Sequence, residues 1–332
     1  MTASSSPREP AAPYQPVSVV IPVLNEERHL RAAVRGILAQ DYPGELEVVL
    51  AIGPCRDRTR EVAAALCRED PRVRTVDNPS GRTPDALNAA IAASRHEIVA
   101  RVDGHAELSG GYLRLAVDEL RRVGADNVGG IMDAQGVTPF ERAVACAMRS
   151  RIGVGNAAFH VGGEAGEAQT VYLGVFRREA LARVGGYDPA FARAQDWEMN
   201  HRIRRTGGLV WFTPDLRVTY RPRGSARALA GQYFHYGRWR RVVARHHDGT
   251  INLRYLAPPA TVVATVVATV AGLFWRPAWA VPAGYLLAVS IGGWLISRGE
   301  TVPVRVRVPV AVTTMHWAWG IGFLTSPPSL AR

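Results

Sequence analysis

The most constraining stretch of the sequence is its start, where a continuous apolar run, VSVVIPVLN (Val17–Asn25), ends at a polar turn. A second apolar run, LEVVLAIG, begins at Leu46, and between the runs the stretch Glu26–Gln40 is predicted to be helical, because Leu30, Val34 and Ile37 recur in it at helical spacing. Such continuous runs are typical of parallel strands, which are buried on both faces. The pattern predicts a strand, a helix and a second strand, and hence an α/β fold with a parallel sheet.

The alternation of strands and helices continues further along the chain. We predict helices over Thr59–Arg68, Thr83–Ser94 and Gly111–Arg122, and strands over Arg72–Asp77 and up to Val102. From Gly129 onward glycine clusters interrupt the pattern, as in VGGEAGEAQT and RVGGYDPAF. There we expect longer, irregular connections that build the substrate side of a site.

The chain after Ala257 is strongly apolar, and its only acidic residue is Glu300. Its three apolar segments cover residues 257–275, 278–296 and 309–324, and the third carries His316. The first two approach the roughly 20 apolar residues that span a bilayer. We predict two to three transmembrane helices over residues 257–325, whereas a buried hairpin in a soluble protein also fits segments so close to the length limit.

All 40 basic residues are arginine, and the formal net charge is +11. The absence of lysine excludes a P-loop and Schiff-base chemistry. Nine arginines lie between Arg217 and Arg254, with Asp248 the only acid among them. A basic stretch beside an apolar tail fits anionic lipid headgroups, so we predict an amphipathic interfacial segment over residues 227–256. A solvated arginine-rich face is the alternative. With no nucleic-acid-binding motif, no nucleic-acid partner is predicted.

Three further features bear on location. Arginines between the second and third apolar segments predict, by the positive-inside rule, that the main domain lies on the cytoplasmic face of the membrane. The cysteines, Cys55, Cys67 and Cys146, lack the spacing of a disulfide framework or a zinc site. Residues 1–15 are rich in Ser, Pro and Ala, and we predict a disordered tail there.

Polar residues follow three of the predicted strands. Asn25 and Glu26 follow the first, Asp57 comes shortly after the second, and Asp103 with His105 follows a later one. In parallel sheets ligands bind beyond the carboxyl ends of the strands, so these positions are candidates for one site. Each alone also fits an ordinary cap or turn, and Asp-Gly after a strand is a common turn signal.

Six motifs in order carry a family resemblance: VVIPVLNEE, IGPCRDRT, NPSGRTPDALNAAI, VDGHA, AQDWEMNHRI and QYFHYGRWR. From about Val17 to Arg241 the sequence resembles the inverting family 2 glycosyltransferases of GT-A fold. Within them it is most similar to the membrane-associated exopolysaccharide enzymes of the succinoglycan glucosyltransferase type.

The resemblance implies a GT-A catalytic domain over residues 16–226. It also implies inverting transfer of a hexose from a nucleotide-diphosphate sugar, with a UDP-sugar favoured, to a lipid-linked saccharide in cell-envelope or exopolysaccharide synthesis. Two alternatives remain open. One is a processive polysaccharide synthase, and the other is a catalytically silent membrane scaffold that binds nucleotide sugars.

The resemblance assigns Asp103 and His105 to a divalent cation, Mn²⁺ or Mg²⁺. Members of the family usually show Asp-x-Asp where this chain has Asp-Gly-His. A cation held there acts as a Lewis acid on the departing diphosphate. Imidazole can replace the second carboxylate and favours Mn²⁺ slightly.

Further residues are implied to meet the nucleotide sugar. They are Pro22, Asn25, Glu26, Asp57, Arg82, Asp85 and Asp103. Alternatively, Asp57 caps the helix that begins near Thr59, Asp85 caps the helix in which it lies, and Arg82 forms a surface ion pair.

An inverting transfer needs a base to take the proton of the attacking hydroxyl. Asp196 matches the second residue of the family's Glu-Asp motif, with Gln195 in place of the glutamate. N-capping is the rival explanation for Asp196, and Glu198 is the alternative base.

The stretch HYGRW, residues 235–239, corresponds to the family's Gln-x-x-Arg-Trp motif with histidine at the glutamine position. The resemblance places Arg238 at the diphosphate and Trp239 at the acceptor sugar. The same stretch also fits an interfacial amphipathic helix that leads to the apolar tail.

Overall fold

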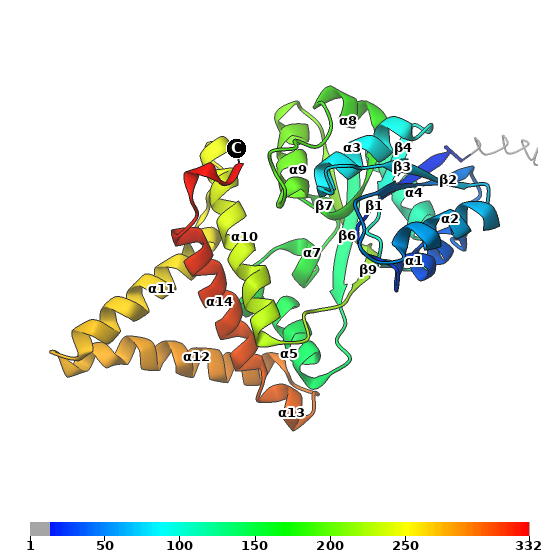
Figure 1. The fold of residues 1–332 in the computed structure, drawn as a ribbon. Coiled ribbons are helices and arrows are strands. Elements are labelled where there is room, and N and C mark those ends of the chain that lie inside the picture. Colours follow the sequence, from blue (N-terminus) through cyan, green and yellow to red (C-terminus); the bar gives the residue numbers. More distant parts are fainter. Residues whose placement is uncertain (1–13, 332) are drawn as a thin grey trace, which may run out of the picture.

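The computed structural model describes residues 14–331, so residues 1–13 of the tail predicted to be disordered lie outside it. An α/β head is joined to a group of helices that includes a projecting hairpin (Figure 1). The strands are β1 Val17–Val23, β2 Leu46–Ile52, β3 Val73–Asp77, β4 Ile98–Arg101, β5 Glu107–Leu108, β6 Asn127–Ala134, β7 Gly166–Glu167, β8 Tyr172–Arg177 and β9 Val210–Tyr220.

The helices that come first in the chain are mostly short. They are α1 Leu30–Leu38, α2 Thr59–Glu69, α3 Thr83–Ala93, α4 Tyr112–Val123, α5 Pro139–Met148, α6 Arg151–Val154, α7 Ala158–Val161, α8 Arg178–Arg183 and α9 Gln195–Arg205. The remaining helices are α10 Ala226–His246, α11 Leu253–Gly272, α12 Ala280–Ile296, α13 Val302–Arg305 and α14 Val308–Leu324, with short 3₁₀ turns at Arg276–Trp279 and Pro328–Ala331. Among the first helices, α5 packs against α14.

One mixed sheet organises the head, in the order β3-β2-β1-β4-β8-β6-β9-β5, with β7 paired to β9. Strands β1 to β4 pair in parallel, as do β6 and β9, whereas β8 runs antiparallel to both of its neighbours. The predicted α/β fold with a mostly parallel sheet is confirmed. The parallel half places the carboxyl ends of β1, β2 and β4 along one edge.

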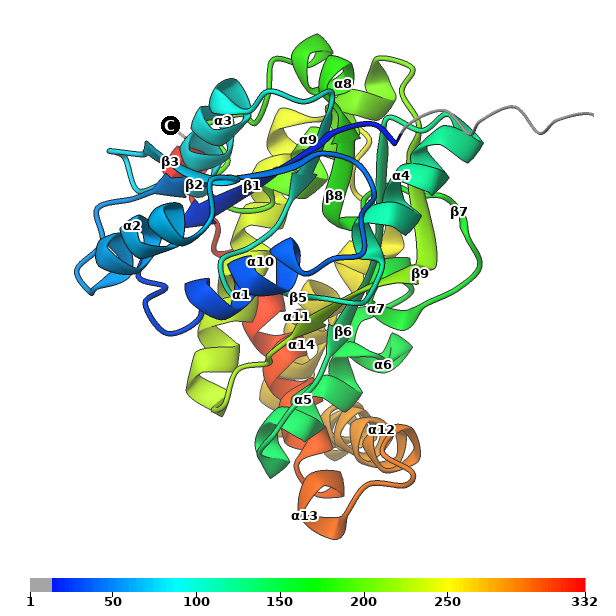
Figure 2. The same ribbon diagram turned by 90° about the vertical axis from the view of Figure 1, so that its right-hand side faces the viewer.

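The first strand shows why the sheet is buried on both faces. Successive side chains of a strand point to opposite faces, so Val19 contributes to one hydrophobic cluster and Val20 to the other. Helices α1, α2 and α4 cover the first face, and α3, α8 and α9 cover the second (Figure 2).

Two predictions about the elements are wrong. The chain is not irregular from Gly129, because β6 continues through it to Ala134. Gly130 permits this, since a Cβ there would lie 1.9 Å from the carbonyl oxygen of Leu216 on β9. Helix α1 begins at Leu30 rather than Glu26, because Thr59 Oγ1 accepts a hydrogen bond from the Glu26 backbone and holds those residues in a loop.

Helices α10 and α14 run side by side and connect the head to the hairpin (Figure 1). Glycines at the contact bring the two backbones together. A Cβ on Gly237 would lie 2.0 Å from the Trp319 carbonyl oxygen, and one on Gly322 would lie 2.1 Å from the Phe234 carbonyl oxygen. The α10 surface that carries Phe234 and Gly237 is therefore committed to α14.

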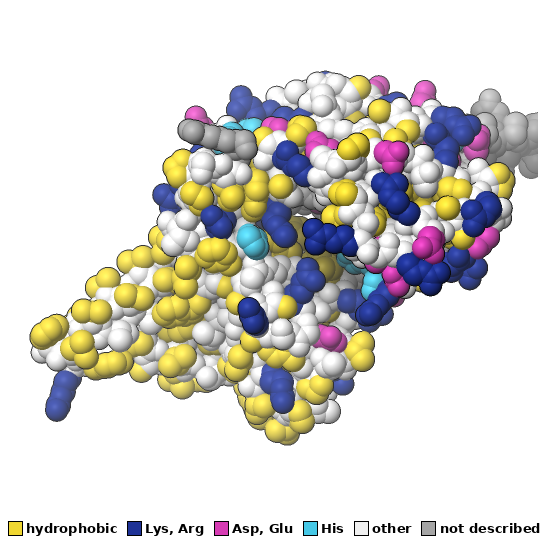
Figure 3. All heavy atoms as spheres, viewed as in Figure 1, with side chains coloured by type: hydrophobic (Ala, Val, Ile, Leu, Met, Phe, Trp, Pro, Cys, Tyr) yellow, Lys and Arg dark blue, Asp and Glu magenta, His cyan; other side chains and the backbone are white. Residues whose placement is uncertain are grey.

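Helices α11 and α12 form the projecting hairpin. The segments Leu253–Gly272 and Arg276–Ile296 are long and apolar enough to cross a membrane, and 22% and 17% of them, respectively, is buried. Apolar side chains cover the hairpin surface (Figure 3). A buried hairpin of a soluble protein would hide these side chains, so the exposure disfavours that alternative. The third apolar segment, α14, buries Val312, Met315 and Phe323 instead.

Candidate active site

A cavity of about 1230 Å³ opens between the head and helices α10, α11 and α14. Its floor is the carboxyl edge of the sheet, where Pro22, Asp103 and His105 lie, and its far wall includes Thr261 and Trp319 of the apolar tail. Figure 3 shows the hollow between the head and the hairpin, with basic side chains around it. One cavity thus extends from the sheet edge to the apolar helices.

A buried arginine joins the two carboxylates that the sequence singled out. Arg101, at the end of β4, is 5% exposed, and its Nη2 donates to Asp103 Oδ1 at 3.0 Å. Its Nη1 donates to Asp196 Oδ1. Burial alone would lower the pKa of Arg101, but the charge and hydrogen bond of Asp103, together with Tyr187 and Tyr172, outweigh burial and raise it. Asp103 and Asp196, 93 residues apart in the sequence, therefore face the same part of the cavity.

Helix α9 sets the position of Asp196 in its first turn. Ala194 precedes the helix with a φ of 59°, a left-handed conformation that costs a non-glycine residue about 1–3 kcal/mol. A buried chain of amides holds the helix to the sheet, because Asn127 Nδ2 donates to Asn200 Oδ1 at 2.6 Å and Asn200 Nδ2 donates to Thr170 at 3.0 Å. The base candidate is thus held by a fixed element.

The alternative base, Glu198, is committed elsewhere. Its carboxylate is 1% exposed and pairs with Arg202 through two hydrogen bonds of 2.7 Å. His247 Nε2 lies 3.1 Å from the same carboxylate. Glu198 does not line the cavity, whereas Asp196 does, with 30% of its side chain exposed.

His105 is oriented by a second carboxylate. Its Nδ1 lies 2.8 Å from Glu26 Oε1, and this hydrogen bond raises the pKa of His105. A histidine that ligates a metal commonly donates its other ring N–H to a carboxylate, which fixes the ring and increases its basicity. Glu26 therefore fits the role of a partner to His105, with Nε2 left for a cation.

The carboxylate of Asp103 and the imidazole of His105 fit a divalent cation whose other ligands come from the substrate. Among residues 14–331 no three His, Cys, Asp or Glu side chains gather into a metal site. One carboxylate and one imidazole leave most positions of a six-coordinate Mn²⁺ or Mg²⁺ to other oxygens. Nucleotide phosphates typically supply these oxygens.

The loops after β1 and β2 are tied together beside this edge. Asn25 adopts a φ of 57°, and its Oδ1 accepts from the Arg56 backbone at 2.8 Å. Asp57 accepts from Thr59 and from the Glu27 backbone, and the hydrogen bond from the Thr59 hydroxyl lowers the pKa of Asp57. Neither Asn25 nor Asp57 lines the cavity. Both hold the loop that presents Glu26.

The two remaining residues predicted to bind the nucleotide sugar, Arg82 and Asp85, also differ in whether they reach the cavity. Arg82 lines the cavity and Asp85 does not. Asp85 Oδ2 accepts from the Ser80 hydroxyl at 2.6 Å and so fixes the turn before α3.

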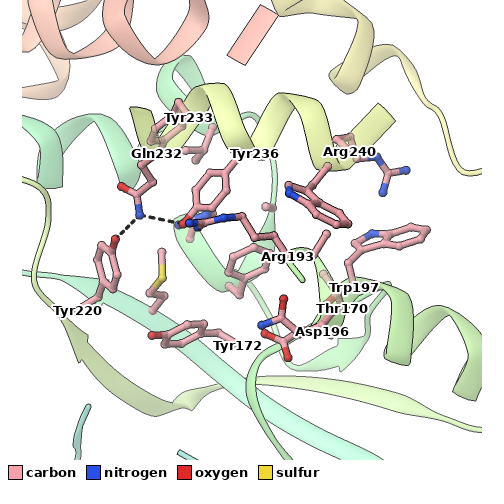
Figure 4. Close-up of a pocket in the computed structure, with 18 of the residues that line it drawn as sticks. Thr170, Tyr172, Arg193, Asp196, Trp197, Tyr220, Gln232, Tyr233, Tyr236 and Arg240 are labelled. Carbon is pink, nitrogen blue, oxygen red and sulfur yellow. Dashed lines mark hydrogen bonds between the residues drawn. The ribbon is translucent and has the colours of Figure 1, made fainter. Parts of the chain in front are cut away.

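Helix α10 forms the wall opposite Asp196 (Figure 4). The α10 residues that line the cavity lie on one face of the helix: Gln232, Tyr233, Tyr236, Trp239 and Arg240. Gln232 Nε2 donates to the hydroxyls of Tyr220 and Tyr236 at 2.7 and 2.9 Å, which braces this wall against β9. Arg238 lies off the lining, with its guanidinium 5.4 Å from the Phe234 ring centroid.

The cavity is electropositive. Three acidic side chains line it, those of Glu26, Asp103 and Asp196, whereas seven arginines do so: Arg82, Arg101, Arg151, Arg193, Arg223, Arg240 and Arg254. A cleft lined by one sign of charge concentrates ligands of the opposite sign. This cavity therefore suits a polyanionic ligand such as a nucleotide diphosphate.

Sequence reasoning missed Arg101, although a signal was present. Side chains two apart on a strand share a face, so a charged residue two positions before Asp103 was placed to meet it. Trp197, Arg193 and Tyr255 were also missed, and only their assembly around the cavity identifies them.

Comparison with known proteins agrees with the geometry. A profile described as "Glycosyl transferase family 2" matches residues 18–185. The succinoglycan biosynthesis protein ExoA of Rhizobium meliloti (strain 1021) is 33% identical over 308 residues, which cover 92% of this chain and 93% of ExoA.

More distant relatives extend the likeness. A dolichyl N-acetyl-alpha-D-glucosaminyl phosphate 3-beta-D-2,3-diacetamido-2,3-dideoxy-beta-D-glucuronosyltransferase of Methanococcus voltae is 21% identical over 92% of this chain and 95% of its own length. The mannosyltransferase PcManGT of Pyrobaculum calidifontis, solved in complex with GDP-Man and Mn²⁺, superposes with a TM-score of 0.60 at 21% identity, over 93% of this chain and 89% of PcManGT. The shared architecture confirms the predicted GT-A fold. The chain belongs to glycosyl transferase family 2 and is a glycosyltransferase.

Proposed function

We propose that the protein transfers a hexose from a nucleotide-diphosphate sugar to a lipid-linked saccharide, with inversion at the anomeric carbon, in exopolysaccharide or cell-envelope synthesis. A UDP-sugar is the proposed donor. The observation that carries the proposal is the pairing of Asp103 and Asp196 through Arg101 at the floor of a cavity that extends onto apolar helices.

The donor side lies at the carboxyl edge of the sheet. Asp103 and His105 hold the divalent cation in this proposal, and the cation supplies Lewis-acid stabilisation of the leaving diphosphate. Glu26 orients His105 through the 2.8 Å contact with its Nδ1. Arg82, exposed in the loop before α3 and part of the cavity lining, contacts the phosphates or the sugar in this proposal. The GDP-Man and Mn²⁺ bound to PcManGT support a donor and a metal of these classes.

The acceptor side lies between α9 and α10. Asp196 takes the proton of the attacking hydroxyl, and the Arg101 guanidinium, which donates to its carboxylate, holds it in place. Trp239, 6% exposed and 6.4 Å from the Phe191 ring, offers an aromatic surface to the acceptor sugar. Arg238, the residue assigned to the diphosphate from the motif, would have to rotate away from Phe234 to reach it.

The apolar hairpin supports a membrane-bound acceptor. We propose that α11 and α12 cross the bacterial inner membrane and that the head lies on its cytoplasmic face. Residues of α11 that line the cavity, among them Tyr255, Pro258 and Thr261, then place its outer end at the membrane surface, where a lipid-linked sugar is presented.

The decisive experiment measures sugar transfer from UDP-sugars in membranes that contain the full chain and lipid-linked saccharide. Asp196→Asn is expected to lower the rate by about 10²–10⁴-fold, because it removes the base, while Mn²⁺-dependent UDP binding persists. Asp103→Ala is expected to abolish that binding. Asp118→Asn, which removes an exposed carboxylate of α4 outside the cavity, is the matched control and should change neither.

Other results would refute the proposal in distinct ways. If Asp196→Asn transfers sugar at the full rate, Asp196 is not the base. If Asp103→Ala still binds UDP in a metal-dependent way, Asp103 is not the metal ligand. A silent scaffold would bind UDP in the wild type but turn over no sugar. A processive synthase would extend the acceptor by many sugars, whereas we expect the addition of one.

A further inference from the structure

Arg240 on α10 is a buried cation without an anionic partner. It is 6% exposed, and its guanidinium lies between two aromatic rings, 4.1 Å from the centroid of Trp197 and 3.9 Å from that of Tyr255. Its Nη2 donates to the Thr250 carbonyl oxygen. Its Nε and Nη1 have no hydrogen-bond partner among residues 14–331.

A second arginine adjoins the first. Arg254, half-buried in the first turn of α11, donates from Nη2 to the Tyr255 hydroxyl, and its guanidinium lies 4.6 Å from the same ring. Neither arginine forms an ion pair with a carboxylate in the described part of the chain. Burial is the main cause that lowers the pKa of Arg240 to about 10; the charge of Arg254 acts in the same direction and Tyr255 opposes it.

A buried cation is costly without a counter-charge, and at Nε and Nη1 of Arg240 no group of the described residues replaces the lost water, while the half-buried Arg254 adds a second positive charge beside it. Both side chains line the cavity, so a ligand can supply that charge. Arginine's planar fork of N–H groups matches the oxygens of a phosphate.

The position of the pair separates it from the donor site. Trp197 directly follows Asp196 in α9, and its ring contacts the Arg240 guanidinium. Figure 4 shows Arg240 and Trp197 on one side of the cavity, away from Tyr220 and Tyr172. Beyond Tyr255 the wall continues along α11 as Ala257, Pro258 and Thr261. A ligand bound here has a phosphate at the arginines and an apolar chain along the hairpin.

We propose that Arg240 and Arg254, joined by Tyr255, form an anion site for the phosphate or diphosphate that links the acceptor sugar to its lipid. The site rests on the proposed function, since it places the acceptor's phosphate beside Trp197, the residue that follows the proposed base in α9. The aromatic rings on both faces of Arg240 fix the guanidinium in a plane, so its free N–H groups are set in place before the ligand binds.

The test uses the full chain in detergent micelles, with farnesyl diphosphate as the probe, farnesol as the probe without phosphate, and calorimetric titration as the measurement. Wild type is expected to bind farnesyl diphosphate more tightly than farnesol or inorganic pyrophosphate. Arg240→Gln should weaken farnesyl diphosphate binding by about tenfold or more, since a charge-assisted contact is lost. Mn²⁺-dependent UDP binding should stay unchanged and reports that the variant is folded.

Arg227→Gln is the matched control, because it removes one exposed arginine from the first turn of α10, outside the cavity. It should bind the probe as wild type does. Arg254→Gln is the second test variant and takes the place of Arg240→Gln if that chain fails to fold.

Several outcomes would overturn the inference. Equal binding of farnesyl diphosphate by wild type and Arg240→Gln shows that no such site exists. Parallel loss of UDP binding assigns Arg240 to the donor. Equal binding of inorganic pyrophosphate, or equal competition by phosphatidylglycerol, shows a site for free anions or for bulk headgroups.

The inference and the proposed function fail separately. If the wild type transfers no sugar but binds the probe through Arg240, the anion site is supported and the proposed function is refuted. If the wild type transfers sugar and Arg240→Gln leaves the KM for the acceptor unchanged, the proposed function is supported and the anion site is refuted.

Discussion

Replacing Gly237 by alanine tests whether the contact between α10 and α14 sets the shape of the active site. The new Cβ would lie 2.0 Å from the Trp319 carbonyl oxygen and 2.8 Å from the Phe323 backbone nitrogen. Both are backbone atoms that cannot rotate away. To restore an ordinary contact of 3.4 Å, the two helices would have to separate by about 1.4 Å.

That separation has two measurable effects. Overpacking of a tight contact destabilises by about 1–3 kcal/mol, and the higher helix propensity of alanine offsets up to about 1 kcal/mol of this. We therefore expect Gly237→Ala to lower the free energy of unfolding by up to about 2 kcal/mol. The same shift displaces Trp239 and Arg240, and a misplacement of about 1 Å can lower a rate by about 10²-fold.

Gly231→Ala is the matched control on the same helix. A Cβ at Gly231 meets nothing within 4 Å, so the substitution should stabilise slightly and leave transfer intact. Thermal unfolding in detergent and sugar transfer in membranes measure the two effects. If Gly237→Ala and Gly231→Ala behave alike in both assays, the close contact does not shape the site.

Three further predictions follow from contacts of the head. Arg101→Gln should lower the transfer rate at least tenfold, because hydrogen bonds to charged groups contribute about 1.5–3 kcal/mol each; an unchanged rate would show that Asp196 needs no such partner. Glu26→Gln should weaken Mn²⁺ binding in the presence of UDP by about 10- to 100-fold, since it removes the partner of His105, and a direct Mn²⁺ titration detects this. Burial alone would raise the pKa of Glu47, but hydrogen bonds from Ser18, the Arg95 backbone and Arg74 outweigh it and lower the pKa. Glu47 therefore stabilises the fold above the ordinary glutamate pKa and loses this contribution as the pH falls through its folded value, so Glu47→Gln should flatten the acid limb of thermal stability without changing transfer at neutral pH.

The sequence predicted most of the head because its elements obey local rules. Strands β1 and β2 are apolar runs with polar ends, and α1 to α4 repeat apolar residues at helical spacing. The prediction failed at β6, because a pair of glycines in a sequence signals a turn. Only the approach of Leu216, from a strand far along the chain, shows that Gly130 is needed inside a sheet.

The residues of the candidate site could likewise be predicted only in part. Asp103 and His105 could be predicted because they follow a strand, and Asp196 because it falls in a motif. Arg240 could not, since its meaning depends on Trp197 and on Tyr255 of α11, which only the folded chain brings to its two faces. Residues whose partners are distant in sequence carry no local pattern.

Helix α10 has two occupied sides, one that lines the cavity and one that lies against α14. We therefore expect the protein to tolerate substitutions on one side of α10 better than on the other. Under the proposed function, exchanging Tyr236 or Gln232 is expected to change which acceptor is used, whereas Phe234 and Gly237 have to be kept for α10 to stay packed against α14. Substitutions aimed at acceptor preference are thereby confined to the face of one helix whose side chains line the cavity.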